Sequence, residues 1–292
     1  MRWRRSAGDD SGIEDRRGQS PAGGFRLPGG RRTAGAGGVV GIVIAIVLAL
    51  LASRGGNGGF DIPGIDLPGA PAADAPALAD APAAEEDLRA FVAFVQRDVQ
   101  DAWDSLFRRA GRGYQPTVVV LFRNQTSSGC GVASSRIGPF YCPPDRKVYL
   151  DLQFFQELRD RFGAPGDFAQ AYLSAHEFGH HVQNLLGTAG EVGAAQRQDP
   201  DQANELSVRL ELQADCYAGI WAHTAFQQNL LEEGDLEEGL NAAAAIGDDR
   251  IQGPGANADT FTHGTSEQRV SWFRRGFDSG VVNDCDTFGG DV

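Results

Sequence analysis

Two histidines and a glutamate stand close enough in the chain to carry out metal chemistry together. His176 and His180 are four residues apart, so on a helix they lie one turn apart on the same face. Two imidazoles placed in this way can bind one zinc ion at about 2.0–2.1 Å. Glu177 follows the first histidine and would point toward a water beside the metal. This H-E-x-x-H spacing predicts a hydrolytic zinc site with Glu177 as the general base.

A catalytic zinc site needs a third protein ligand and an open position. A histidine six residues after His180 is excluded, because that residue is Leu186. Glu211 and Asp215 lie one turn apart in a later apolar segment, and we expect Glu211 to be the third ligand. Asp215 would accept the free N–H of one zinc-binding histidine and so fix its tautomer. A solvated acidic helix edge is the alternative interpretation of these two acids.

Two helices must present these side chains. The first is expected over residues 163–187, beginning near Asp167 and ending at Gly187, because apolar residues recur at steps of three and four. The second is expected over residues 199–226, with Asp199 as its N-cap. The zinc site would then lie between these two helices.

Further elements complete the expected domain. A helical pattern covers residues 85–110, and buried strands are expected over residues 117–122 and 147–152. The predicted fold class is therefore α+β, with a predominantly helical domain and a small sheet.

The 292 residues carry a net charge of −13. A nucleic-acid partner is excluded, because it would require a basic surface facing the phosphates. The charge is uneven: residues 1–34 contain eight Arg and four acidic residues. That segment carries +4, and the rest of the chain therefore carries −17.

The distribution of charge and glycine divides the chain. Residues 35–53 are uncharged and long enough to span a hydrocarbon core of about 30 Å, which predicts a single transmembrane helix. The preceding residues 1–34 would be a disordered basic segment in the cytoplasm. Residues 54–84, rich in Gly, Pro and Ala, would be a disordered linker, and residues 85–292 an extracytoplasmic domain on a single-pass cell-membrane anchor. A cleaved signal peptide is the rival interpretation of residues 35–53, although no Ala-x-Ala site follows them.

The four cysteines bear on the compartment. An even number in a domain placed outside the membrane supports two disulfides. The simplest pairing is Cys130 with Cys142, which flank a loop rich in Gly, Ser and Pro, and Cys216 with Cys285. Three pairings are possible, and four free thiols of a cytosolic protein are the alternative.

Several segments together resemble a known family. Residues 130–143, 148–152, 175–184 and 211–216 are similar to the bacterial putative neutral zinc metallopeptidase family. The Glu-x-x-Ala-Asp element also resembles the gluzincin group of zinc peptidases. That resemblance implies a zincin fold, a small sheet above the H-E-x-x-H helix, in which an edge strand aligns an extended substrate. Residues 148–152 would be that edge.

The resemblance also bears on the C-terminal part of the chain. Residues 262–269 resemble a His-Pro segment followed by Arg in some gluzincins, although Gly264 stands here in place of Pro. It implies that His263 donates a hydrogen bond to the oxyanion of the reaction and that Arg269 orients nearby carboxylates.

These observations predict a membrane-anchored zinc-dependent endopeptidase that acts on a peptide or protein substrate. A zinc-bound water would attack the peptide bond after Glu177 removes its proton. The alternative from another class is a membrane-tethered binding or scaffold protein that keeps the zincin fold without turnover. That alternative gives no reason for Glu177, which metal binding does not require. A cytosolic hydrolase of small molecules is a third hypothesis, and it conflicts with the predicted transmembrane segment.

Overall fold

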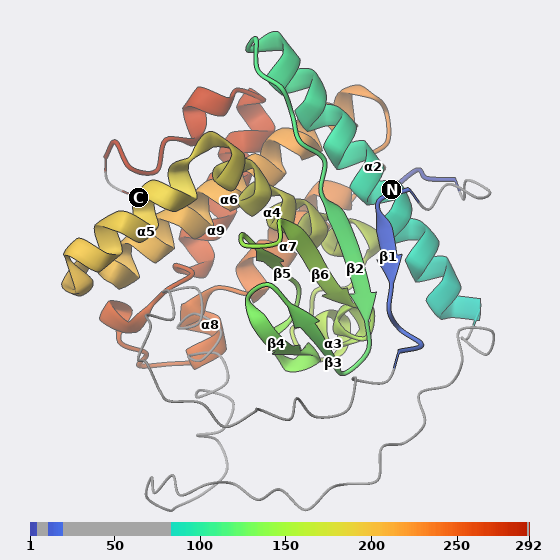
Figure 1. Cartoon of the computed structure of the whole chain (residues 1–292), viewed down its shortest axis with the longest axis horizontal. Coiled ribbons are helices and arrows are strands. Elements are labelled where there is room, and N and C mark those ends of the chain that lie inside the picture. Colours follow the sequence, from blue (N-terminus) through green and yellow to red (C-terminus); the bar gives the residue numbers. More distant parts are fainter. Residues whose placement is uncertain (5–10, 20–82, 291) are drawn as a thin grey trace, which may run out of the picture.

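The computed structural model describes residues 1–4, 11–19, 83–290 and 292, and within these residues the fold is mostly helical with small sheets (Figure 1). This α+β character confirms the coarse fold class expected from the sequence. The predicted transmembrane segment, residues 35–53, lies outside the described residues, as does the linker up to residue 82. Among the described residues, none of the helices combines the length and the apolar character that a membrane span requires.

Eight α-helices are found in the described part of the chain. They are α2 (Ala83–Arg109), α3 (Phe154–Asp160), α4 (Asp167–Leu186), α5 (Thr188–Gln198), α6 (Ala203–Gln227), α7 (Asp235–Ala245), α8 (Asp248–Gln252) and α9 (Ser266–Ser279). Helices α2, α4 and α6 confirm the three helical segments expected from the apolar periodicity. Helix α4 is central, because it packs against α2, α5, α6 and α7 and also contacts the sheet.

The main sheet has four short strands in the order β1-β2-β6-β5. They are β1 (Ile13–Asp15), β2 (Val118–Phe122), β6 (Lys147–Asp151) and β5 (Phe140–Cys142), and a separate hairpin consists of β3 (Gln125–Ser128) and β4 (Gly131–Ser134). Strand β2 pairs in parallel with both β1 and β6, whereas β5 pairs antiparallel with β6. The expectation that residues 148–152 form a substrate-binding edge is therefore wrong, because β6 lies inside the sheet and β5 is the edge strand on that side.

The N-terminal residues differ from the disordered segment that their composition suggested. Residues 13–15 form β1, which lies beside β2 at the edge of the sheet and next to α2 (Figure 1). Met1 is buried, and its ammonium group contacts Asp167 at 2.7 Å. Composition could not reveal this packing, because each partner is contributed by a distant part of the chain.

The ends of α4 follow from local backbone chemistry. Gly187 has φ = 96° and ends the helix in the left-handed conformation, as expected. Gly166 occupies the N-cap position, and Asp167 is the first helical residue and does not cap the helix with its side chain. The Asp167 carboxylate instead binds the Met1 ammonium. An acidic residue in the first turn also interacts favourably with the helix dipole.

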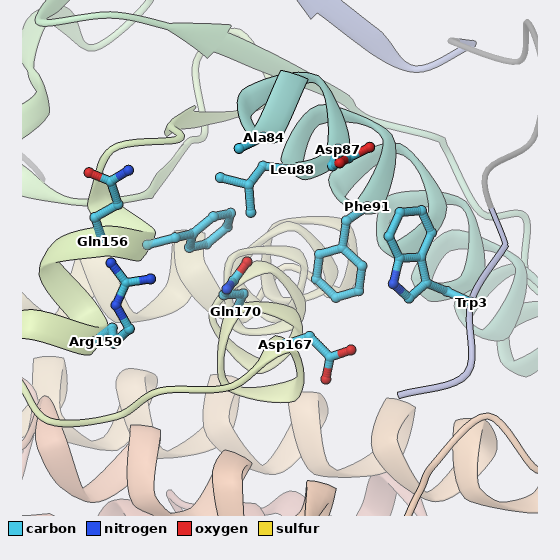
Figure 2. A pocket seen from close by; sticks show the side chains of 10 residues that line it. Trp3, Ala84, Asp87, Leu88, Phe91, Gln156, Arg159, Asp167 and Gln170 are labelled. Carbon is cyan, nitrogen blue, oxygen red and sulfur yellow. The ribbon is translucent and has the colours of Figure 1, made fainter. Parts of the chain in front are cut away.

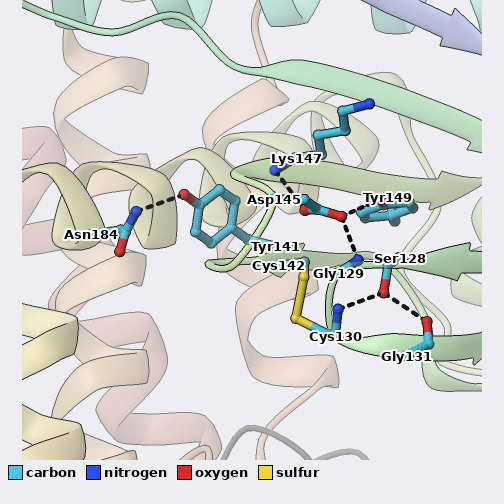
Figure 3. The surroundings of a disulfide bond; sticks show 10 residues. All are labelled: Ser128, Gly129, Cys130, Gly131, Tyr141, Cys142, Asp145, Lys147, Tyr149 and Asn184. Atoms are coloured by element: carbon cyan, nitrogen blue, oxygen red, sulfur yellow. Dashed lines mark hydrogen bonds between the residues drawn. A yellow bond between two sulfur atoms is a disulfide. The ribbon is translucent and has the colours of Figure 1, made fainter.

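Two disulfides fix loops to this framework, and both predicted pairings are confirmed. Cys130–Cys142 joins the β3–β4 turn to the end of β5, and Cys216–Cys285 joins α6 to the C-terminal segment. Around the first bridge, Asp145 accepts hydrogen bonds from the Gly129 amide at 2.6 Å and from the Tyr149 hydroxyl at 2.6 Å (Figure 3). The hairpin is thus held next to the edge strand β5.

Candidate metal centre

The side chains of His176, His180 and Glu211 converge between α4 and α6. Their ligand atoms all lie within 4.8 Å of one another. One Glu211 oxygen is 3.1 Å from Nε2 of His176, and the other is 3.3 Å from Nε2 of His180. The structure thus brings together the three residues that the sequence predicted as metal ligands.

Asp215 orients the first histidine. Its Oδ1 accepts a hydrogen bond from Nδ1 of His176 at 2.8 Å, so Nε2 is the nitrogen that faces Glu211 and would bind a metal. The same carboxylate receives the guanidinium of Arg269 through two bonds of 2.8 and 2.9 Å and the hydroxyl of Tyr172 at 2.5 Å. Asp215, Arg269 and Tyr172 are almost completely buried. This fully paired network holds the His176 ring in one orientation.

A glutamine that sequence reasoning missed orients the second histidine. Nδ1 of His180 donates to Oε1 of Gln183 at 2.9 Å. The Gln183 amide group donates in turn to the Leu210 carbonyl at 2.6 Å, which fixes its amide orientation because a carbonyl can only accept. The signal for Gln183 was its position three residues after His180, on the same face of α4.

The donor set suits zinc. Two imidazole nitrogens and one carboxylate oxygen form a typical catalytic zinc triad. Both imidazoles donate their Nδ1 protons away from the centre, so each Nε2 faces the centre and can bind a metal once it has lost its proton. The residues present therefore fit the metal that their spacing predicts.

Electrostatic attraction between the side chains holds His176, His180 and Glu211 together. Burial opposes ionisation of Glu211, but the facing imidazoles of His180 and His176 hold its pKa well below the usual range. Burial alone would lower the pKa of His176, but the negative charge of Asp215 outweighs burial and raises this pKa to about 10. A metal that binds here must displace a proton from each charged imidazole, so its affinity falls at low pH.

Glu177 lies beside the ligand cluster and is 8% exposed. Burial raises the pKa of its carboxyl group, while the neighbouring histidines and a hydrogen bond from the Tyr141 backbone act in the opposite direction. Tyr141 belongs to the edge strand β5. Glu177 therefore lies between the ligand cluster and the edge of the sheet.

His181 follows His180 in the sequence, but both of its ring nitrogens form hydrogen bonds outside the ligand cluster. Its Nε2 donates to the Gln115 carbonyl at 2.7 Å, and its Nδ1 accepts from the Tyr141 hydroxyl at 3.0 Å. Asn184 donates to the same hydroxyl at 3.0 Å (Figure 3). Burial lowers the pKa of His181, which agrees with a neutral imidazole. This residue fastens α4 to β5.

His263 lies in the loop before α9, where Asp248 holds it. Nδ1 of His263 is 3.2 Å from Oδ1 of Asp248, and the Asp248 Oδ2 accepts the backbone N–H of His263 at 2.6 Å. The charge of His263 contributes to the lowered pKa of Glu211. Asp248, at the start of α8, was missed by sequence reasoning, because only the fold places it next to His263.

A second acidic group in the described residues has the spacing of a metal site. Asp167, Asp235 and Glu238 lie at the first turns of α4 and α7. The Met1 ammonium contacts Asp167 at 2.7 Å and Asp235 at 3.3 Å. The positive charge in this group is therefore supplied by the chain itself.

Two histidines and a glutamate that could hold a metal, with a second, buried glutamate beside them, have the arrangement typical of a metallopeptidase centre. A family model described as "Putative neutral zinc metallopeptidase" matches residues 1–288, and the chain belongs to this family. The family confirms the resemblance found in the sequence motifs. It supports a zinc peptidase in general terms and does not assign a substrate.

Curated relatives cover most or all of the chain. "Uncharacterized protein YpfJ" of Escherichia coli (strain K12) is 45% identical over 294 residues, which is 99% of each chain. "Uncharacterized protein Rv2575" of Mycobacterium tuberculosis (strain ATCC 25618 / H37Rv) is 45% identical over 199 residues, 63% of this chain and 67% of that protein. No solved structure matches the chain.

Proposed function

We propose that the protein is a zinc-dependent endopeptidase whose metal is held by His176, His180 and Glu211. The observation that carries this proposal is the convergence of their ligand atoms within 4.8 Å, beside the buried carboxyl of Glu177. A zinc ion bound there would lower the pKa of a water to about 7 and polarise the carbonyl of the peptide bond. Side chains of the protein would transfer the proton and stabilise the oxyanion.

Glu177 is the proton carrier in this proposal. Its carboxylate removes a proton from the attacking water and passes it to the nitrogen of the leaving amine. The raised pKa of this buried group brings it closer to the pH at which it must both accept and release a proton. Glu177 is not needed to hold a metal, so its presence favours an enzyme over a scaffold without turnover.

His263 is proposed to stabilise the negative charge that develops on the carbonyl oxygen. Asp248 contacts its Nδ1, so Nε2 is the nitrogen available for a substrate. A hydrogen-bond donor that is fixed before the reaction stabilises a developing oxyanion without reorganisation. Arg269 has a different role in the proposal, because it contacts Asp215 and thereby supports the orientation of His176.

The edge strand β5 is proposed to align the substrate, in place of β6. An extended peptide can add to an exposed sheet edge through main-chain hydrogen bonds. Strand β5 is one of the two edges of the main sheet, and the Tyr141 backbone within it reaches the Glu177 carboxylate. A peptide lying along β5 would therefore pass next to the general base.

The domain is proposed to work outside the cytoplasm. Disulfides persist in oxidising compartments, and all four cysteines of the chain are paired. We propose that residues 35–53, which lie outside the described residues, hold the domain at the cell membrane. Its substrates would then be peptides or proteins in the same compartment.

Metal analysis of ligand variants tests the proposed centre. The purified protein should contain about one zinc per chain, and His180→Ala should lose it together with peptide hydrolysis. His223→Ala is a matched control, because His223 lies on α6 and its Nδ1 donates to the Phe277 carbonyl at 2.6 Å. Zinc at full occupancy in His180→Ala would contradict the assignment.

A further inference from the structure

We infer that the N-terminal residues 1–4 and 11–19 are an integral part of the peptidase domain, so that residues 1–19 and 83–292 lie on the same side of any membrane. This inference rests on three separate sets of contacts between the N-terminal segment and the domain. Together the sets join the segment to β2, α2, α4 and α7, and none of them involves the proposed metal ligands.

The first set is backbone pairing. Strand β1 aligns in parallel with β2, with Ile13 opposite Val119 and Asp15 opposite Leu121. The Arg16 amide donates to the Leu121 carbonyl at 2.7 Å, and the Val119 amide donates to the Gly12 carbonyl at 2.8 Å. Strand β1 thus covers polar backbone groups of β2 that would otherwise form an unpaired edge.

The second set surrounds a buried arginine. Arg17 is 1% exposed, and its guanidinium contacts Asp15 within the segment. It also reaches Glu85 at 3.0 Å and Glu86 at 2.7 Å in the first turn of α2. A buried guanidinium needs carboxylate partners, and those of Arg17 come both from the segment and from α2. The pairing of Arg17 with α2 is therefore a strong reason for the segment to remain bound.

The backbone of the segment also passes close to the side chain of Gln96 on α2. Gly12 has φ = 92°, and a Cβ atom there would lie 2.7 Å from Oε1 of Gln96 on α2. Gln96 donates from its Nε2 to the Ser11 carbonyl at 2.9 Å. Only glycine combines this backbone conformation with so little space.

The third set involves the first residues of the chain. Trp3 packs edge-on against Phe91 of α2 with ring centroids 5.3 Å apart. Its side chain also lies at one end of a cavity of about 350 Å³ that is bordered by α2, α3 and α4 (Figure 2). The Met1 ammonium joins Asp167 of α4 to Asp235 of α7. The segment thereby contacts the helix that carries His176, Glu177 and His180.

These contacts also affect what the arginines near the N-terminus indicate about the membrane topology. Arginines before an apolar run favour a cytoplasmic location when they are free. Here Arg16 pairs with Glu14 at 2.7 Å, and Arg17 is surrounded by three carboxylates. An N-terminus in the cytoplasm with the domain outside would require all three sets of contacts to be absent. The bound segment therefore conflicts with a single crossing of the membrane by residues 35–53, and these residues could hold the domain at a membrane only in a way that leaves both of their flanks on one side.

Labelling of single added cysteines tests the inference in cells. The four natural cysteines are paired, so a membrane-impermeant maleimide should report only Arg4→Cys, in the segment, or Arg108→Cys, at the end of α2. Both native side chains are exposed. We expect the two variants of the full chain to be labelled to the same extent, within about twofold, in intact spheroplasts relative to lysed cells.

The labelling results distinguish a failure of this inference from a failure of the proposed extracytoplasmic location. Equal labelling of both positions before lysis supports the inference and an extracytoplasmic domain. Protection of both until lysis also supports the inference but overturns the proposed compartment. Labelling of Arg108→Cys with protection of Arg4→Cys would overturn the inference.

Hydrogen exchange on the purified, unaltered chain tests the packing independently of any variant. The Arg16 amide, which donates to the Leu121 carbonyl at 2.7 Å, should exchange at least about 100-fold more slowly than in an unstructured peptide, because β1 pairs with a central strand. Exchange at the unstructured rate would contradict the inference. Arg17→Ala should abolish this protection, whereas the control Arg136→Ala, at an exposed site in the β4–β5 connection, should preserve it.

Discussion

A single methyl group between α4 and α6 should disrupt the proposed metal site. Gly179 lies between the two histidine ligands on α4, and Ala214 follows Glu211 by three residues on α6. A Cβ atom on Gly179 would lie 2.8 Å from the Ala214 carbonyl oxygen and 3.0 Å from its Cα. Both are backbone atoms, so no side chain can rotate away to make room.

The size of the effect follows from these distances. Ordinary contact begins at about 3.4 Å, so Gly179→Ala must move the helices apart by roughly 0.6 Å. Zinc ligand distances tolerate only about 0.2 Å. We therefore expect zinc affinity to fall at least about tenfold, equivalent to about 1.4 kcal/mol. The free energy of unfolding should also decrease by about 1–2 kcal/mol, because overpacking outweighs the better helix propensity of alanine.

Competition with a chromophoric chelator measures the zinc affinity, and thermal unfolding measures the stability. Gly190→Ala is the matched control, because Gly190 lies in helix α5 with no atom within 4 Å of the added Cβ. This control should keep the zinc affinity and gain about 0.5 kcal/mol of stability. Unchanged zinc affinity in Gly179→Ala would refute the reasoning from the helix spacing.

Two further predictions concern buried charges. Arg269→Lys should weaken zinc binding about 10–100-fold, because an ammonium cannot reproduce the two bonds of the guanidinium to Asp215. The same chelator competition measures this change. Zinc affinity equal to that of the unaltered protein would contradict the supporting role of Arg269. Burial opposes the charge of the Met1 ammonium, but the bond to Asp167 outweighs it and raises its pKa above 8.0. The stabilisation by this ion pair should be present below about pH 8 and lost as the pH rises through the raised pKa. The midpoint temperature of thermal unfolding should therefore fall with rising pH in the unaltered chain, and it should fall less steeply in Asp167→Asn. Identical slopes in the two proteins would count against this ion pair.

Local patterns were enough to predict the helices that carry the site. The apolar periodicity of α4 and α6 is strong, and the spacing of His176 and His180 places both on one face. Glu211 and Asp215 could be paired with them because one turn separates the two acids. These features depend on neighbours within one helix, and sequence spacing reports such neighbours directly.

Several contacts between distant segments were beyond sequence reasoning. The pairing of Ile13 with Val119 joins residues more than a hundred positions apart, and the segment around Ile13 is too short and polar to be recognised as a strand. The position of β6 inside the sheet depends on strand order, which its own residues do not encode. Asp248 became visible only when the fold placed it beside His263.

Glu177→Gln tests the central claim most directly. The substitution keeps the size of the side chain but removes the carboxylate that accepts a proton. The account predicts that the variant retains about one zinc per chain while its hydrolysis of a peptide library falls at least about 100-fold below that of the unaltered protein. Equal hydrolysis by the two proteins, at equal zinc content, would contradict it.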